Sequence, residues 1–351
     1  MAQKVYVGLS GGVDSSVSAA LLKQQGYDVH GIFMKNWSKP IGRFECPWRD
    51  DYLDAKRVAA ALNIPFELVD FENEYFDRVV SYMLEAFRHG ITPNPDVMCN
   101  QEIKFKLFLE VCQDKGADFI ATGHYAKTEA GHLLRAVDEG KDQTYFLYRV
   151  SREALQKTLF PLGEYKKSDV RILAQTFSLP TAHKKESMGI CFVGKVGIKD
   201  FLKEYVGEQL PGQIINQHGA VVGEHDGAIF YTIGQRSGLG VGGGLPYYVY
   251  GKDIAKNEVY VTNNLADPSL WRTKVVLSNV HWINQPSSTT TLYARNRHRA
   301  ELVPVKQFQR LPTGEIELHF AEPVRALTPG QSTVLYSDTE CLGGGIVAVS
   351  R

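Results

Sequence analysis

The sequence predicts an α/β protein: a parallel-sheet nucleotide-binding domain, followed by a small central domain and a C-terminal β-barrel. Three observations predict this class. Hydrophobic strand patterns alternate with amphipathic helix patterns through residues 4–126, which is the order of a parallel sheet covered by helices. A glycine- and serine-rich turn follows the first strand pattern. From residue 271 onwards the chain reads as six short strands, which is typical of a small barrel.

The elements of the first half follow from hydrophobic periodicity and from glycines that end helices. We expect strands at residues 4–10, 27–37, 65–71 and 117–126, and helices at residues 15–26, 51–64, 74–90 and 103–116. Three predicted strand ends carry polar or small residues, and parallel strands bring such ends to one edge of the sheet. We place the domains at 1–195, 196–270 and 271–351, the central one opening with a short helix pattern.

The turn Ser10–Ser16, SGGVDSS, has the composition of an anion site. A strand, a small-residue turn and a helix leave backbone N–H groups free at the helix N-terminus. Gly11 and Gly12 allow a close backbone approach, and the serines add hydroxyl donors. Asp14 would repel a phosphate unless Mg²⁺ lay between them, so the turn predicts a Mg²⁺-bound polyphosphate site. It lacks the lysine of a Walker A loop. The alternative is an Asp/Ser helix cap.

A second glycine motif is interpreted as a loop. Gly238, Gly240 and Gly243 form G-x-G-x-x-G, but a strand-like LPYYVYG follows them where a dinucleotide fingerprint needs a helix. We therefore predict a tight turn here and no dinucleotide site.

Composition limits the partners and the compartment. Lys+Arg and Asp+Glu both number 39, so a nucleic acid would have to meet a local basic surface. No apolar stretch has the length of a membrane span, and the first strand starts too early for a signal peptide. The five cysteines include no C-x-x-C pair, which argues against disulfides or a zinc site and favours a reducing cytoplasm.

Several motifs together resemble one enzyme family. SGGVDSS resembles the PP-loop of the N-type ATP pyrophosphatases. TPNPDVMCNQEIKF (92–105), ATGHYA (121–126), GKDQTYFLY (140–148), ESMGICFVG (186–194) and YTIGQRSGLG (231–240) are similar to tRNA-specific 2-thiouridylases of the MnmA type. The resemblance implies ATP-dependent replacement of the C2 oxygen of the tRNA wobble uridine by sulfur. It also implies the three-domain fold that we predict from the patterns.

The resemblance implies roles for individual residues. ATP would be held by Gly8, Leu9, Ser10, Gly11, Gly12, Val13, Asp14 and Ser15, with Met34 and Gly123 on the adenine side. Mg²⁺ on Asp14 is our inference from charge. Contacts to tRNA are implied for Asn94, Pro95 and Asp96 at the target base, and for His124, Lys141, Asp142, Gln143, Arg297, His298 and Gln331.

Two cysteines are the catalytic candidates. Cys191 has glycines on both sides and basic residues nearby in the sequence that would favour a thiolate, so it is the expected persulfide carrier. The resemblance makes Cys99 its partner nucleophile, with a transient Cys99–Cys191 disulfide. An iron–sulfur cluster on Cys99, Cys191 and a third ligand is an alternative. We expect Cys112 and Cys341 to be buried structural residues and leave Cys46 unassigned.

The expected partners are tRNA and a persulfide-donating protein, either a sulfur-relay protein or a cysteine desulfurase. Arg295, Arg297 and Arg299 alternate, so in a strand they would share one basic face suited to phosphates. The competing functions are another PP-loop tRNA modifier, such as a 4-thiouridine or lysidine synthetase, and a non-catalytic RNA-binding protein. The two cysteine motifs argue against lysidine formation, and the intact PP-loop argues against a non-catalytic role.

Overall fold

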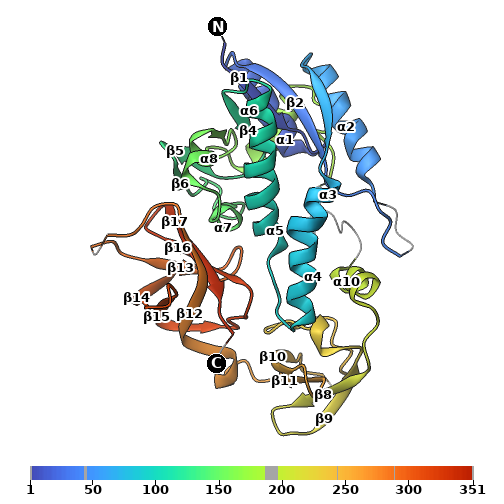
Figure 1. Ribbon diagram of the computed structural model, residues 1–351, viewed down its shortest axis with the longest axis vertical. Helices are drawn as coiled ribbons and strands as arrows, with labels where there is room; N and C mark the ends of the chain where they lie inside the picture. The colour runs from blue at the N-terminus through green and yellow to red at the C-terminus, as the bar shows by residue number, and fades with distance from the viewer. Residues whose placement is uncertain (1, 43–45, 186–196, 243, 288, 350–351) are drawn as a thin grey trace.

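The computed structural model describes residues 2–42, 46–185, 197–242, 244–287 and 289–349 (Figure 1). The N-terminal sheet has the order β3-β2-β1-β4-β7, and every pairing in it is parallel. Its strands are β1 (Lys4–Gly8), β2 (Asp28–Lys35), β3 (Phe66–Asp70), β4 (Phe119–Ala121) and β7 (Thr158–Leu159). This sheet confirms the α/β class predicted from the alternating patterns.

Helices cover the sheet and link it to the rest of the molecule. They are α1 (Val13–Gln24), α2 (Trp48–Ala61), α3 (Glu72–Tyr75), α4 (Ser81–Arg88), α5 (Pro95–Met98), α6 (Phe108–Asp114), α7 (Thr144–Leu147), α8 (Arg152–Gln156), α9 (Lys167–Thr176) and α10 (Ile198–Val206). Two π-helical segments, η1 (Phe76–Val80) and η2 (Cys99–Leu107), join α3 to α4 and α5 to α6. Short 3₁₀ turns are η3 (Ala228–Phe230) and η4 (Pro268–Leu270).

The packing of α1 explains the position of the turn before it. This helix carries apolar residues on two sides, because one side packs against β1 and β2 and the other packs against α9. Ala19 and Leu22 pack with the sheet residues Val5 and Val7, whereas Leu21 packs with Val170 of α9. Being buried on two sides, α1 fixes the turn at its N-terminus.

The C-terminal domain is a closed barrel. Its strands are β12 (Trp271–Trp282), β13 (Tyr293–Arg295), β14 (Val303–Arg310), β15 (Ile316–Arg325), β16 (Ser332–Tyr336) and β17 (Glu340–Val347), and a β12–β17 pairing closes it. This confirms the predicted barrel. A hairpin that the patterns did not reveal, β5 (Lys127–Glu129) and β6 (His132–Leu134), extends the barrel sheet through β17. The N-terminal and C-terminal parts of the chain thus share one sheet.

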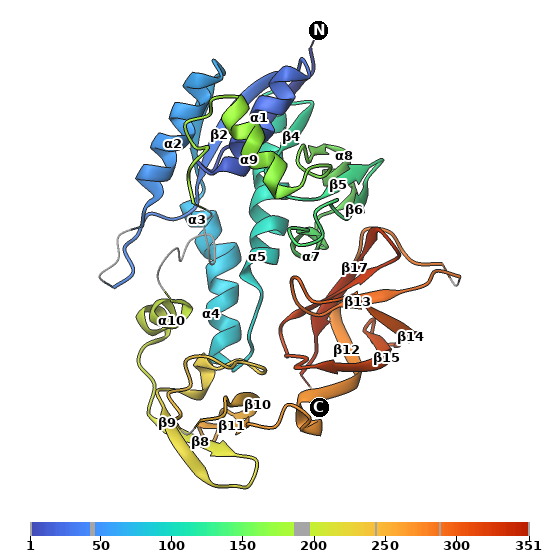
Figure 2. The ribbon, with the colours of Figure 1, turned by 180° about the vertical axis from the view of Figure 1, so that it is seen from behind.

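The central domain contains a small sheet of order β10-β11-β8-β9, from β8 (Gly212–Asn216), β9 (Val221–His225), β10 (Tyr248–Asp253) and β11 (Glu258–Thr262). Gly238 and Gly240 have positive φ and lead towards strand β10, which confirms the predicted turned loop. Figures 1 and 2 show this domain beyond the end of α4, whereas the barrel lies to the side of α4. Within the described ranges, no helix combines the length and apolarity that a bilayer crossing requires.

Candidate functional site

Three strand ends meet at the glycine turn, as the patterns predict. Gly8 ends β1 so close to Met34 of β2 that a Cβ on Gly8 would lie 2.9 Å from the Met34 methyl carbon. Gly123, just beyond β4, is equally tight, because its Cβ would lie 2.7 Å from the Ser15 nitrogen. A side chain at Gly123 would collide with the backbone at the start of α1, whereas one at Gly8 would displace the end of the Met34 side chain. The residues expected around ATP therefore come from three strands and lie together.

The turn leaves the first N–H groups of α1 directed out of the helix. The N-cap position is occupied by Gly12, which has no side chain, so the alternative that an Asp or Ser residue caps this helix is wrong. The Ser10 N–H donates to the Ser15 hydroxyl at 3.2 Å, and the Ser16 hydroxyl donates to the Gly12 carbonyl at 2.7 Å. The serines thus shape the turn, and the helix N-terminus supplies the positive end of its dipole.

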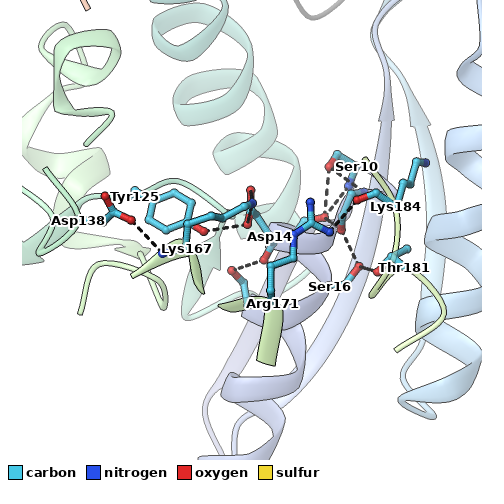
Figure 3. A network of polar contacts seen from close by, with 12 residues as sticks. Ser10, Asp14, Ser16, Tyr125, Asp138, Lys167, Arg171, Thr181 and Lys184 are labelled. Atoms are coloured by element: carbon cyan, nitrogen blue, oxygen red, sulfur yellow. Dashed lines mark hydrogen bonds and ion pairs between the residues drawn. The ribbon is translucent and has the colours of Figure 1, made fainter. Parts of the chain in front are cut away.

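Asp14 lies in a network of polar contacts (Figure 3). Its two carboxylate oxygens lie 2.6 and 2.8 Å from the Nζ atom of Lys167, and the Tyr125 hydroxyl donates to one of them at 3.0 Å. Nearby, Lys184 Nζ lies 2.8 Å from Asp51 and 2.6 Å from Asp54 on α2. Two lysines from distant parts of the sequence therefore flank the turn.

The surroundings of Asp14 do not form a metal site made of protein ligands alone. Among the residues that the structure describes, no three His, Cys, Asp or Glu side chains are grouped as metal ligands. Both oxygens of Asp14 are already bound to an ammonium group. Asp14 is thus paired with Lys167, and Mg²⁺ on Asp14 stays a prediction.

A second part of the site is a cavity of about 340 Å³ between the N-terminal domain and the barrel. This volume is within the usual range of small-molecule pockets. Residues expected at the target base and in the tRNA contacts line it together, although they are far apart in sequence: Asn94, Pro95, Asp96, Arg297, His298 and Gln331. The fold therefore brings together two predicted segments and one predicted residue.

Hydrogen bonds hold the walls of this cavity. The Gln331 side-chain amide donates to the carbonyls of Thr92 and Pro93, both at 2.9 Å, so the barrel fixes the segment before Asn94. Arg297 donates to the carbonyls of Ile233 at 2.8 Å and Ala326 at 3.2 Å. These residues join all three domains at the rim.

Burial controls the protonation of two cavity residues. Burial lowers the pKa of His298 to about 4, so this side chain is a neutral ring at pH 7. It lies 4.6 Å from the ring of Phe146, centre to centre. Burial raises the pKa of Asp96 despite the opposing charge of Lys104, so this carboxyl keeps a proton more readily than an exposed aspartate.

The prediction that Arg295, Arg297 and Arg299 share an exposed strand face is wrong. Strand β13 ends at Arg295, and Arg299 has a φ of 64°, so the alternation of an extended strand is lost. Arg295 is buried and pairs with the buried carboxylate of Asp142 at 2.9 Å. From this stretch of the chain, Arg297 and His298 line the cavity.

Three other residues predicted to contact tRNA, His124, Lys141 and Gln143, are not among those that line the cavity. His124 is buried, its ring nitrogen lies 2.8 Å from the Thr122 hydroxyl, and burial lowers its pKa well below the usual value. The Gln143 side chain accepts a hydrogen bond from the Tyr125 N–H at 2.9 Å. Lys141 is half-buried next to Asp142. The turn and the barrel are therefore linked through this segment.

The cysteines differ sharply in their surroundings. Cys99 is the first residue of η2, on the helix that Asn94 caps, and it is 2% exposed. Cys112 and Cys341 are fully buried, and burial raises the pKa of both thiols, which confirms that they are structural. Cys46 donates to the Trp37 carbonyl at 3.5 Å. Cys191 lies outside the described residues, so its pairing with Cys99 stays a prediction.

Sequence reasoning missed the contacts of Lys167 and Tyr125 with Asp14. Lys184 is one of the basic residues expected to favour the Cys191 thiolate. Its ion pairs with Asp51 and Asp54 were not predicted. The segment KKSDVRILAQT has the helical spacing of α9, which could have revealed the helix but not its contact with a turn 153 positions earlier. Only the tertiary packing of α9 against α1 brings Lys167 to Asp14.

Comparisons with known proteins place the chain in a family. A family model described as tRNA methyl transferase HUP domain matches residues 3–195. A tRNA methyl transferase PRC-barrel domain matches residues 199–263, and an aminomethyltransferase beta-barrel domain matches residues 272–347.

The chain is also similar to three solved structures over part of its length. The chain is 19% identical to an NMN synthetase from Francisella tularensis, covering 53% of this chain and 66% of that one, with a TM-score of 0.35. A predicted subunit of tRNA methyltransferase from Methanocaldococcus jannaschii is 21% identical over 49% of this chain and 74% of that one, with a TM-score of 0.33. A 4-thiouridine synthetase in complex with RNA and ATP is 15% identical over 57% and 46%, with a TM-score of 0.36.

The match to the HUP-domain model covers more than half of the chain, and the other two models follow it in order along the sequence. The chain therefore belongs to the tRNA methyl transferase HUP-domain family and has the three-domain architecture of the tRNA-specific 2-thiouridylases.

Proposed function

We propose that the protein is a tRNA-uridine 2-sulfurtransferase that uses ATP to thiolate the wobble uridine. ATP binds at residues 8–15 with Met34 and Gly123, and its α-phosphate is transferred as AMP to the C2 oxygen of uracil, with release of pyrophosphate. A carbonyl oxygen is a poor leaving group, whereas its adenylate is a good one. Sulfur from a cysteine persulfide then replaces the adenylated oxygen, and AMP leaves.

One observation carries this proposal. Asn94, Pro95, Asp96, Arg297, His298 and Gln331 line a single cavity in a chain that belongs to a family described by its tRNA-related domains. An RNA base that is read by a protein is usually turned out of its stack into such a pocket and stacked on an aromatic ring. His298 and Phe146 supply neutral rings in the wall of the cavity.

Cys99 and Cys191 divide the sulfur chemistry in this proposal. Cys191 receives the persulfide from a sulfur-relay protein or cysteine desulfurase, and Cys99 acts on it near the base. In one route the Cys99 thiolate attacks the inner sulfur of the Cys191 persulfide and expels the outer sulfur as sulfide, which then displaces AMP from C2. In the other route the outer sulfur attacks C2 first and displaces AMP, and Cys99 then attacks the Cys191 sulfur and releases the thiolated base. Both routes leave a Cys99–Cys191 disulfide, which an external thiol then reduces. Cys99 directly follows α5, the helix whose N-cap Asn94 lines the cavity, and this position supports its role.

Mass spectrometry of tRNA nucleosides tests the function. Cells lacking the protein should lose 2-thiouridine derivatives from the wobble position and keep 4-thiouridine. Loss of 4-thiouridine or of lysidine instead would assign the protein to another tRNA modification. An unchanged nucleoside profile would support a non-catalytic RNA-binding role.

A further inference from the structure

The glycine turn lacks a lysine in its own sequence, yet the fold supplies one. Phosphate-binding loops of the Walker type carry a lysine that reaches the β- and γ-phosphates. Residues 10–16 contain none. In the structure the ammonium of Lys167 lies 2.6 and 2.8 Å from the carboxylate oxygens of Asp14, in the first turn of α1 (Figure 3).

The contacts around Lys167 fix its position. Its backbone N–H donates to the Asp138 carboxylate at 2.9 Å, which secures the start of α9. Its ammonium lies 5.7 Å from the centre of the Tyr125 ring, and the hydroxyl of this ring donates to Asp14. Farther along α9, Val170 packs against α1 in the core. The lysine is therefore held by its main chain, by a ring and by a carboxylate.

Charge explains why a lysine is needed here. A bare Asp14 carboxylate would repel the phosphates that the helix N-terminus attracts. Lys167 neutralises it, and its side chain is 14% exposed while that of Asp14 is 33% exposed, so the pair lies at the surface of the turn. The cation that the sequence assigned to Asp14 as Mg²⁺ is thus present as an ammonium group.

We propose that Lys167 is the phosphate-binding lysine of this site. Asp14 positions the ammonium, and the ammonium binds the β- and γ-phosphates of ATP, which carry most of its negative charge and leave as pyrophosphate. In this proposal Asp14 would hold the ammonium and would not be needed as a ligand of the Mg²⁺ that binds ATP. This inference rests on the proposed function, because it needs ATP at this turn.

Calorimetric binding of α,β-methylene-ATP and of AMP, each with Mg²⁺ and with EDTA, tests the proposal. Lys167→Met should weaken binding of the ATP analogue about tenfold or more, the usual effect of losing a hydrogen bond to a charged group, and change AMP binding less than about twofold. Lys167→Arg should retain most of the affinity. Lys166→Met is the matched control, because it removes an exposed neighbouring charge and should change neither ligand.

The outcomes separate this inference from the proposed function. A wild-type protein that fails to bind the ATP analogue contradicts the ATP site itself. A Lys167→Met variant that binds the analogue like the wild type, or loses the analogue and AMP equally, contradicts the phosphate role alone. Lysine labelling of the wild type gives a second readout that needs no variant. The ATP analogue should protect Lys167 while AMP does not, and equal labelling with both ligands would overturn the proposal.

Discussion

Single residues in this protein serve both the site and the joints between domains. Gln331 lines the cavity and also donates to two carbonyls of the N-terminal domain. Arg297 is exposed at the rim and donates to carbonyls of two other segments. A substitution at such a residue affects the position of the walls as well as any ligand contact, so an experiment has to separate the two effects.

For Arg297→Ala, the salt dependence of tRNA binding distinguishes a lost phosphate contact from a displaced cavity wall. If Arg297 binds a tRNA phosphate, the variant weakens binding of all substrate tRNAs similarly and lowers the slope of log K against log salt by about one. Filter binding between about 50 and 200 mM salt measures this slope. Arg299→Ala removes a nearby exposed charge as the control. Weaker binding with an unchanged slope would show that Arg297 only holds the rim.

The roles proposed for Cys99 and Cys191 predict different fates for labelled sulfur. Cys191→Ser should accept no sulfur from a persulfide donor, whereas Cys99→Ser should accept it on Cys191 and thiolate tRNA poorly. Peptide mass spectrometry locates the label. Cys46→Ser is a control because Cys46 is outside the proposed relay, and it should behave like the wild type. Label on Cys99 in the Cys191→Ser protein would reverse the assignment.

At the scale of elements, the sequence patterns predicted the helices and strands that depend on residues close together in the chain. The strand before Ser10, the helix after it and the closed barrel follow from periodicity and from glycines, because these signals act over a few positions. Contacts between segments far apart in the sequence could not be predicted from these patterns. Strand β6 joins β17 more than two hundred positions later, and α9 brings Lys167 to Asp14. Arg295 reads as an exposed strand residue, yet it is buried because Asp142 lies opposite it.

Two ion pairs connect helix α10 to the residue that follows strand β9, and their contribution to stability can be tested. Asp226, after β9, pairs with Lys199 at 2.6 Å and with Lys203 at 2.7 Å. Burial alone would raise the pKa of Asp226, but the two lysines lower it to about 2. The carboxylate is therefore paired at neutral pH, and this contribution to stability is lost as the pH falls from about 4, the unfolded value, towards 2.

Asp226→Asn should lower the free energy of unfolding by about 1 kcal/mol or less at pH 7, because the pair is partly exposed to solvent. Urea unfolding at several pH values should show the difference from the wild type narrowing below about pH 4. A difference that stays constant down to pH 3 would mean that the side chain acts through packing and not through its charge.

At the scale of the whole molecule, one buried ion pair joins the N-terminal domain to the barrel. The Asp142 carboxylate accepts hydrogen bonds from Arg295 at 2.9 Å, from the Thr144 hydroxyl at 2.8 Å and from the Ala136 N–H at 3.2 Å. Its side chain is fully buried, and that of Arg295 is 6% exposed. Asp142 is thus enclosed by protein donors, and we propose that it organises the neighbouring Lys141 and Gln143 without touching tRNA itself.

Arg295→Met tests this joint. The substitution leaves the Asp142 charge buried without its guanidinium partner, which typically costs about 3–5 kcal/mol. Adding Asp142→Asn removes the charge and should recover part of the loss, because an uncharged amide is cheaper to bury than an unpaired carboxylate. Lys274→Met in the same barrel breaks a pair whose lysine is 52% exposed and should cost about 1 kcal/mol or less. Urea unfolding compares the three variants with the wild type. If Arg295→Met is no more costly than Lys274→Met, solvent reaches Asp142 in solution and the two domains are held together by the β6–β17 pairing instead.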